Sequence, residues 1–153
     1  MTLADFLRPE YVQLHPAATS RDAAIREIAA LLETDVKVLD WEELHRRVAA
    51  SAPCVAEPGA SFCICLPHAR TAAVTEMVMS VGRFDSGLRI ARVEQPVRYL
   101  FCIAVPPEMA TDYLRIIGLL ARIVKDPKSE VQIHTAATPE EFIETLARLE
   151  ATL

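Results

Sequence analysis

His68 is the residue whose type and surroundings suit it best to chemistry. It follows Pro67 and the apolar run from Phe62 to Leu66, which has the composition of a strand buried on both faces. A histidine at the exposed end of such a strand can offer one ring nitrogen to a reaction while a neighbour holds the other. The stretch therefore predicts a reactive imidazole at the end of a buried strand.

Cys63 and Cys65, just before this histidine, raise the alternative of a metal site. Alternate strand residues share one face, and thiolates suit zinc. His68, however, would point to the opposite face of a continuing strand, and no second Cys-x-x-Cys pair completes four ligands. We therefore interpret the cysteines as buried, reduced thiols. The chain also has no Walker loop or dinucleotide fingerprint, so we expect neither a metal nor a cofactor.

The composition indicates one folded domain over residues 1–153. More than half of the residues are hydrophobic and only 24% are charged, which excludes a disordered linker. A net charge of -5 argues against a nucleic-acid binder, which needs a basic face. No signal peptide is visible, and no apolar run approaches the roughly twenty residues that cross a bilayer. We expect a cytoplasmic protein without stable membrane insertion.

Helical and strand patterns alternate along the chain. Helical spacing of apolar residues predicts helices over 19–33, 40–52, 111–125 and 138–149, with a short one over 1–8. Apolar runs predict strands over 11–14, 62–66, 77–84 and 97–105, a turn at 85–87 and an edge strand over 88–94. Residues 128–137 suit either a strand or a helix. Within 111–125, we expect an inward face formed by Leu114, Ile117, Leu120, Ala121 and Val124. The alternation predicts an α/β fold with helices covering the sheet.

The order of several motifs is informative beyond each motif alone. A turn at Gly59 leads into the apolar strand and then into Pro67-His68-Ala69-Arg70. A second apolar strand ends in Val105-Pro106, a helix follows, and residues 136–141 have the pattern Ala-x-Thr-x-Glu-Glu. This set spans nearly the whole chain and resembles the phosphotransferase-system enzyme IIA domain of the fructose, mannitol and nitrogen-regulatory type. The resemblance implies a mixed β-sheet covered by helices on both faces.

The resemblance also implies a role for His68 as a phosphoryl acceptor. In this family the histidine takes a phosphoryl group from phospho-HPr, a phosphocarrier protein, and passes it to a sugar-transport domain such as enzyme IIB. In the nitrogen-regulatory branch, the phosphorylation state instead governs binding to regulatory partners. The phosphoryl oxygens need donors, for which the candidates are Arg70, Ser61 and Tyr113.

The chain departs from the family pattern at positions around the histidine. Ala52 stands where the family often has an arginine that supports the site, and Tyr113 replaces a second histidine. Of the glycines in the family's turn, only Gly59 is present. Three hypotheses follow. The first is a phosphoryl-carrier regulatory protein resembling nitrogen-regulatory enzyme IIA, the second a binding-only regulatory module without phosphotransfer, and the third a sugar-specific enzyme IIA component.

Overall fold

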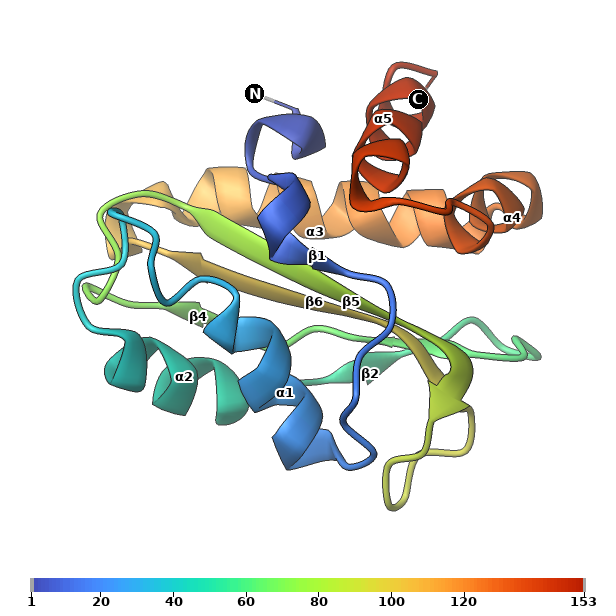
Figure 1. The fold of residues 1–153 in the computed structure, drawn as a ribbon, viewed down its shortest axis with the longest axis horizontal. Coiled ribbons are helices and arrows are strands. Elements are labelled where there is room, and N and C mark those ends of the chain that lie inside the picture. Colours follow the sequence, from blue (N-terminus) through green and yellow to red (C-terminus); the bar gives the residue numbers. More distant parts are fainter. Residues whose placement is uncertain (1, 153) are drawn as a thin grey trace.

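A mixed β-sheet lies between two layers of helices in the computed structural model, which describes residues 2–152 (Figure 1). The strands are β1 (Val12–Gln13), β2 (Cys54–Val55), β3 (Cys63–Cys65), β4 (His68–Arg70), β5 (Val78–Leu88) and β6 (Val97–Val105). Their order is β1-β5-β6-β3-β2, and β4 pairs with β6 beyond the end of β3. The pairs β1–β5, β3–β6 and β4–β6 are parallel, while β2–β3 and β5–β6 are antiparallel.

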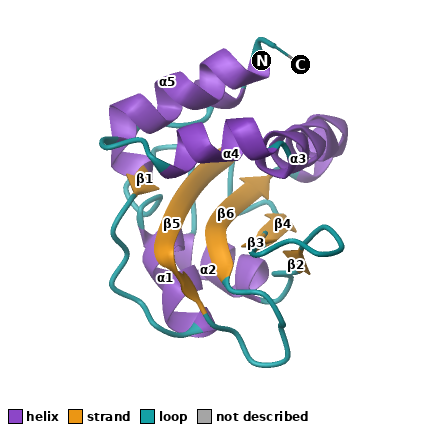
Figure 2. Ribbon diagram, turned by 90° about the vertical axis from the view of Figure 1, so that its right-hand side faces the viewer, coloured by secondary structure: helices purple, strands orange, loops and turns teal. Residues whose placement is uncertain are grey.

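Helices cover both faces of this sheet. They are α1 (Arg21–Ala30), α2 (Trp41–Ala49), α3 (Ala110–Lys125), α4 (Pro127–His134) and α5 (Pro139–Glu150). Helices α1 and α2 lie on one face, and α3, α4 and α5 lie on the other (Figures 1 and 2). The predicted α/β class, with a mixed sheet covered on both faces, is therefore confirmed.

Three of the helices begin at the caps that the sequence predicts. The side chains of Ser20, Asp40 and Thr138 each accept a hydrogen bond from the backbone N–H three residues further on. Such a bond satisfies one of the donors that a helix leaves unpaired at its start, which fixes where the helix begins. Helix α3 is the exception. It begins at Ala110, directly after the 3₁₀ turn Pro107–Met109, and not at a cap on Thr111 or Asp112.

Strand β6 is the centre of the sheet, as its apolar sequence predicts. It pairs with β5 on one side and with β3 and β4 on the other, and all its residues except Arg98 are buried. A strand with two partners and both faces covered can be almost wholly apolar. Because β3 and β4 share this partner, β6 holds in place the stretch that carries His68.

Strand β5 differs from its predicted limits. It continues through 85–87, where the sequence predicts a turn, and ends at Leu88. The register with β6 shifts between Arg83 and Leu88, and Gly87 has a φ of 80°, so the extra residues form an irregular ladder instead of a turn. The predicted edge strand over 88–94 is wrong, because the chain turns back after Leu88 and Arg92 adopts a φ of 68°.

The N-terminal segment and the region after α3 also differ from the simplest sequence patterns. Of the predicted helix over 1–8, Met1 lies outside the described residues and the rest contains only the 3₁₀ turn Leu3–Asp5; a second 3₁₀ turn, Pro9–Tyr11, follows. The ambiguous stretch 128–137 folds mainly as helix α4, which Pro127 begins. The alternating pattern in this stretch is short, and the contacts that α4 makes with the sheet favour the helix over a strand.

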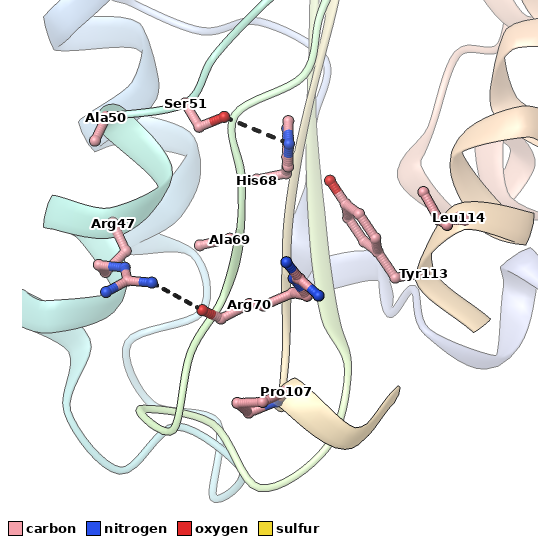
Figure 3. Close-up of a pocket in the computed structure, with 9 residues that line it drawn as sticks. All are labelled: Arg47, Ala50, Ser51, His68, Ala69, Arg70, Pro107, Tyr113 and Leu114. Carbon is pink, nitrogen blue, oxygen red and sulfur yellow. Dashed lines mark hydrogen bonds between the residues drawn. The ribbon is translucent and has the colours of Figure 1, made fainter. Parts of the chain in front are cut away.

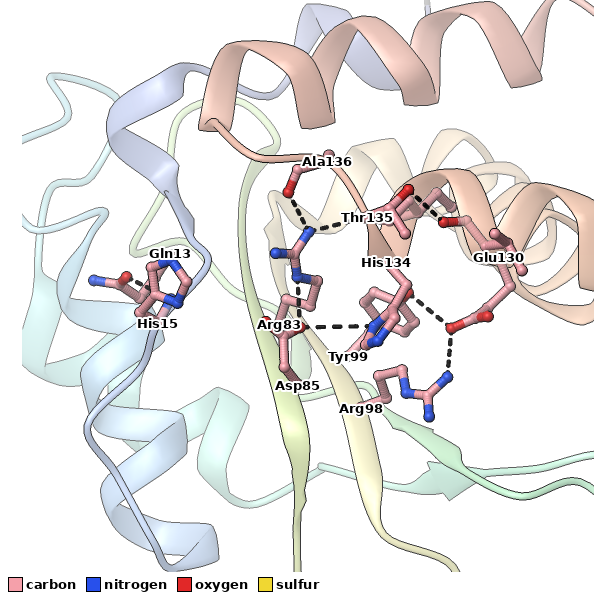
Figure 4. Close-up of polar contacts among 12 residues, drawn as sticks. Gln13, His15, Arg83, Asp85, Arg98, Tyr99, Glu130, His134, Thr135 and Ala136 are labelled. Atoms are coloured by element: carbon pink, nitrogen blue, oxygen red, sulfur yellow. Dashed lines mark hydrogen bonds and ion pairs between the residues drawn. The ribbon is translucent and has the colours of Figure 1, made fainter.

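Hydrogen bonds from charged side chains connect α4 to the sheet (Figure 4). Glu130 accepts hydrogen bonds from the Arg98 guanidinium at 2.6 Å and from the Tyr99 hydroxyl at 3.1 Å. Arg83, only 4% exposed, donates to the carbonyl oxygens of Ile133 and Ala136 at 2.9 and 2.8 Å. These bonds require the end of α4 to present its carbonyls to β5, an arrangement that local sequence does not specify.

The buried face of α3 matches the predicted one only in part, since Leu120 and Val124 are buried as expected. Leu114, expected inward, is 66% exposed, whereas Tyr113 and Ile116 are buried. Two sets of apolar residues in this helix have helical spacing, one starting at Leu114 and one at Tyr113. The sequence does not show which set is buried, because that depends on packing against the sheet. The choice matters for function because it turns Tyr113 toward β4.

Candidate functional site

An interrupted strand positions His68. Cys65 on β3 pairs with Leu100 of β6, and His68 on β4 pairs with Ile103. Between them, Pro67 has no N–H and breaks the ladder, although its carbonyl still accepts a hydrogen bond from Ile103 at 3.0 Å. His68 is therefore the first residue of a new strand and not the last of the apolar strand, which corrects the sequence-based expectation.

The contacts of the His68 ring define its tautomer. Nδ1 lies 2.7 Å from the carbonyl oxygen of Leu66. A carbonyl only accepts hydrogen bonds, so Nδ1 carries the proton and donates it. In the neutral ring the lone pair then belongs to Nε2, which lies 3.4 Å from the Ser51 hydroxyl (Figure 3). The half-buried imidazole thus presents a nucleophilic nitrogen of fixed orientation.

A pocket of about 770 Å³ opens in front of this ring. Three parts of the chain form it: the end of α2 with the residues after it, strand β4, and the start of α3 with the turn before it. The lining residues are Arg47, Ala50, Ser51, His68, Ala69, Arg70, Pro107, Tyr113 and Leu114. Figure 3 shows these side chains around the imidazole. Of the predicted site residues, the structure therefore brings His68, Arg70 and Tyr113 together.

Tyr113 places an unpaired hydroxyl in the pocket. Its ring lies 5.4 Å from the His68 ring, and Figure 3 shows the hydroxyl directed toward the imidazole. The residue is only 6% exposed, and its hydroxyl has no hydrogen-bond partner among the described residues. Burial raises the pKa of Tyr113 to about 12, although the positive charge of Arg70 opposes the rise. The group therefore stays protonated near neutral pH and is available as a donor.

Two arginines give the pocket its positive charge. Arg70 lies two residues after His68 on β4, so both side chains point to the same face of the strand. Arg47, from α2, donates a hydrogen bond to the Arg70 carbonyl oxygen at 3.1 Å, and both side chains are exposed. An exposed guanidinium in such a pocket can meet phosphoryl oxygens with two parallel bonds.

Ser61 does not lie with His68. It lines a different pocket, of about 400 Å³, together with Phe62, Arg98 and the turn at Gly59. The reason is geometric: Ser61 precedes β3 and His68 follows it, so the strand carries the two residues to opposite ends. Three strand residues and their neighbours separate them by on the order of 20 Å. Ser61 is therefore too far from His68 to act as a donor there.

Sequence reasoning missed two residues of the site, Ser51 and Arg47. Ser51 reaches the site only because its segment pairs with the segment of His68, next to the short edge strand β2. Its carbonyl oxygen accepts a hydrogen bond from the His68 N–H at 2.9 Å. Arg47 belongs to an Arg-Arg pair on a helix that also carries Glu42 and Glu43, a pattern that is typical of a solvated helix face. Its place three residues after the buried Leu44 on α2 could have suggested that it lies near the sheet.

The described residues contain no obvious metal centre. Within residues 2–152, no three His, Cys, Asp or Glu side chains are arranged to hold a metal ion. The cysteines are free thiols: Cys63, Cys65 and Cys102 are buried and Cys54 is partly buried. In the same part of the chain, no helix is both long and apolar enough to span a membrane.

The fold and the pocket define an α/β protein with a histidine of fixed tautomer, His68, at a cationic pocket. Residues 5–149 match the family described as "Phosphoenolpyruvate-dependent sugar phosphotransferase system, EIIA 2". The chain therefore belongs to this enzyme IIA family, as the resemblance of its motifs indicates.

Two curated relatives align with almost the whole chain. The 2-O-alpha-mannosyl-D-glycerate-specific EIIABC component of Escherichia coli is 27% identical over 95% of this chain. The chain covers only 22% of that larger protein. The fructose-specific EIIA component of Haloferax volcanii is 25% identical, with 92% of this chain and 91% of the relative covered.

Solved structures confirm the fold. The nitrogen regulatory protein IIA-Ntr of Neisseria meningitidis superposes with a TM-score of 0.78 at 19% identity, covering 94% of this chain and 98% of its own. The mannitol enzyme IIA of Escherichia coli, solved in complex with phosphorylated enzyme IIB, superposes with a TM-score of 0.71 at 19% identity. That match covers 93% of this chain and 97% of the other.

Proposed function

We propose that this chain is a regulatory phosphoryl carrier, in which His68 accepts a phosphoryl group from phospho-HPr and its phosphorylation state controls binding to partner proteins. The observation that carries the proposal is the Nε2 lone pair of His68, which faces a cationic pocket while Nδ1 is held by Leu66. Family membership supplies the class of reaction.

The transfer step needs little more than this geometry. The Nε2 lone pair attacks the phosphorus and forms an N–P bond, while the bond from phosphorus to HPr breaks and its electron pair leaves with HPr. The imidazole becomes positively charged as the bond forms. The Leu66 carbonyl stabilises that charge, because the hydrogen bond it accepts from Nδ1 becomes stronger when the donor is cationic.

The surrounding donors receive the phosphoryl oxygens. In such transfers negative charge spreads over three oxygens, and catalysis depends on donors that are already in position. The Arg70 guanidinium and the Tyr113 hydroxyl lie on one side of the imidazole, and the Ser51 hydroxyl lies beside Nε2. Tyr113 supplies a neutral donor where the family has a second histidine, so we expect transfer to be slower than in a site with two cations.

Phosphorylation would change the charge of the pocket enough to alter partner binding. A phosphoryl group adds about two negative charges near neutral pH. These would offset the positive charges of Arg47 and Arg70 at a face that also exposes Leu114. A partner that docks on this face therefore meets a cationic surface before phosphorylation and a roughly neutral one afterwards.

Delivery of the phosphoryl group to a sugar-transport enzyme IIB is the second candidate function. It is favoured by the sugar-specific relatives from Escherichia coli and Haloferax volcanii. The two functions differ in one measurable property. A sugar-specific component loses its phosphoryl group rapidly when mixed with its enzyme IIB, whereas a regulatory carrier retains it and changes its affinity for a partner.

The test is phosphorylation of the purified chain with phosphoenolpyruvate, enzyme I and HPr. We expect the intact mass to increase by one phosphoryl group, and the added group to be lost in acid, as the N–P bond of phosphohistidine is. The exposed His15, which lies outside the pocket, provides a matched control, because His15→Ala should be labelled like the wild type. No mass gain under conditions that label a known enzyme IIA would support the binding-only module instead.

Tyr113→Phe is expected to slow phosphorylation without weakening the fold. The variant loses one neutral hydrogen bond to the phosphoryl group, worth about 1 kcal/mol or roughly fivefold in rate. Thermal unfolding should occur at an equal or higher temperature, because the buried hydroxyl has no protein partner to lose. Tyr99→Phe is the matched control: it removes the bond to Glu130, so it should lower stability and leave the rate unchanged. A Tyr113→Phe variant as fast as the wild type would exclude the hydroxyl as a donor.

A further inference from the structure

A pair of cysteines lies across the edge strand β2 and its neighbour β3, near the His68 pocket. Cys54 of β2 and Cys65 of β3 are directly opposite each other in the antiparallel ladder. Neither thiol lines the pocket or takes part in the proposed transfer. Cys65 is fully buried and Cys54 is partly exposed, so one member of the pair is accessible to a small reagent.

The hydrogen-bond pattern of the ladder shows what kind of pair this is. The Leu66 N–H donates to the Pro53 carbonyl, and the His68 N–H donates to the Ser51 carbonyl, both at 2.9 Å. Antiparallel strands alternate between hydrogen-bonded and non-hydrogen-bonded pairs, so Cys54 and Cys65 form a non-hydrogen-bonded pair. In such a pair the Cα atoms are about 4.5 Å apart and the side chains are at their closest.

This geometry is compatible with a disulfide. Disulfide bonds join residues whose Cα atoms are roughly 4.4–6.8 Å apart and whose Cβ atoms point toward each other. Opposite residues of a ladder have side chains on the same face of the sheet, which meets the second condition. Cys63 lies two residues from Cys65 on the same strand, but the residue opposite Cys54 is Cys65, and the Cys63 thiol lies 3.5 Å from the Gln95 carbonyl oxygen.

The two thiols differ in reactivity. A hydrogen bond from Cys65 and the nearby charge of Arg21 lower the pKa of Cys54 to about 7, although burial opposes the shift. The same interaction with Cys54, together with burial, raises the pKa of the Cys65 thiol. A substantial fraction of Cys54 is therefore thiolate near neutral pH, far more than for an ordinary thiol, and the thiolate is the form that reacts with oxidants.

We propose that Cys54 and Cys65 are a redox modification site, at which a peroxide oxidises Cys54 and Cys65 then forms a disulfide with it. The Cys54 thiolate attacks one peroxide oxygen, the O–O bond breaks, and a sulfenic acid forms as hydroxide leaves. The Cys65 thiol then gives up its proton and attacks the Cys54 sulfur, and the S–O bond breaks. In sum, two thiols and one hydrogen peroxide give one disulfide and two waters.

The disulfide would form close to the carrier site without belonging to it. Ser51 and His68 each lie three residues from one of the two cysteines, on the same pair of chain segments. Oxidation would join these segments covalently, and a dithiol would release them by exchange. The proposal concerns the cysteines alone, and it holds or fails independently of phosphorylation at His68.

Peptide mapping after oxidation tests the pairing. The folded, reduced protein is treated with hydrogen peroxide, denatured, alkylated with iodoacetamide, and digested with trypsin and chymotrypsin. Cleavage after Phe62 separates Cys54 from Cys63 and Cys65. We expect a disulfide-linked pair of peptides, 48–62 and 63–70, in which Cys63 carries the alkyl group and which dithiothreitol separates. A Cys54 that remains fully alkylated, or one linked to Cys63, would overturn the proposal.

Variants separate the two roles. Cys63→Ser should still form the linked pair, whereas Cys54→Ser, at the partly exposed position, should not. In Cys65→Ser the oxidised Cys54 has no partner, so dimedone should trap its sulfenic acid. If Cys65→Ser does not fold, Cys63→Ser and Cys54→Ser still show which cysteines form the disulfide. Loss of the disulfide in Cys63→Ser would contradict the assignment to Cys65.

The pH dependence of alkylation tests the reactivity of Cys54. In the native, reduced protein we expect iodoacetamide to modify Cys54 at a rate that rises with pH and reaches half its maximum near pH 7, because the lowered pKa makes the thiolate available above that pH. The buried Cys102 should stay unmodified, since burial raises its pKa to about 12. A midpoint for Cys54 near the ordinary thiol value, with no reaction at pH 7, would contradict its role as the first thiol oxidised.

Discussion

Replacing His68 with alanine is expected to abolish phosphoryl acceptance. The reaction requires a neutral nitrogen with a free lone pair, and among the residues that line the pocket only the His68 ring has one. The nitrogens of Arg47 and Arg70 are cationic and only donate hydrogen bonds. We therefore expect His68→Ala to show no mass gain with phosphoenolpyruvate, enzyme I and HPr, even at long incubation times, while the wild type is labelled once.

A more conservative substitution, His68→Gln, tests whether the nucleophilic nitrogen itself is required. His68→Gln keeps a polar side chain near Ser51 but has no nucleophilic nitrogen, so it should be equally inactive. Both variants lose the bond to the Leu66 carbonyl, a cost of about 1 kcal/mol that thermal unfolding should detect without loss of the folded state. Labelling of His68→Ala at another histidine, such as His134, would move the acceptor out of the pocket and contradict the proposed mechanism.

The sequence predicts the frame of this molecule better than its details, for physical reasons. Strand β6 is predicted to the residue because its two covered faces demand a continuous apolar run. The helix caps at Ser20, Asp40 and Thr138 are predicted because capping is local. The continuation of β5 to Leu88 is not, since it depends on pairing with Val97, a residue nine positions further on.

The residues of the candidate site also differ in whether local sequence predicts them. His68 and Arg70 are found from sequence because they lie on one short strand. Ser51 reaches the pocket through strand pairing, which leaves no local signal, and Arg47 reaches it through the packing of α2, which its spacing from Leu44 indicates only in part. Ser61 lies outside the His68 pocket because nearness in sequence does not give nearness in space when a strand separates the two residues. A site whose residues come from several helices and strands is therefore predicted only in part from the sequence.

The tyrosine at position 113 has a consequence for the balance of charges in the pocket. A second histidine could be protonated and would then stabilise the phosphoryl oxygens as a cation. Tyr113 keeps its proton up to a pKa of about 12 and stays neutral. Charge stabilisation in this chain therefore depends on arginine, and Arg70 is the arginine on the same strand as the nucleophile.

Arg70→Ala is accordingly expected to slow phosphorylation of His68 about a hundredfold. Removing one preorganised donor from a transition state costs roughly a hundredfold to a thousandfold in rate, and we expect the lower end because the Arg70 side chain is exposed to solvent. Arg70→Lys keeps the charge without the two-pronged geometry, so it should recover only part of the rate. The measurement is the initial rate of mass gain at a fixed concentration of phospho-HPr.

Arg47→Ala is the matched control for this prediction. Arg47 also lines the pocket, but its guanidinium donates to the Arg70 carbonyl and comes from α2. If Arg70 binds the phosphoryl oxygens directly, Arg47→Ala should slow the reaction only slightly and Arg70→Ala should dominate. Equal losses in both variants would mean that the pocket acts through its total charge, and raising the salt concentration would then slow the wild type by a similar factor, because screening weakens exposed charges. A direct contact predicts instead that Arg70→Ala remains far slower than the wild type at every salt concentration.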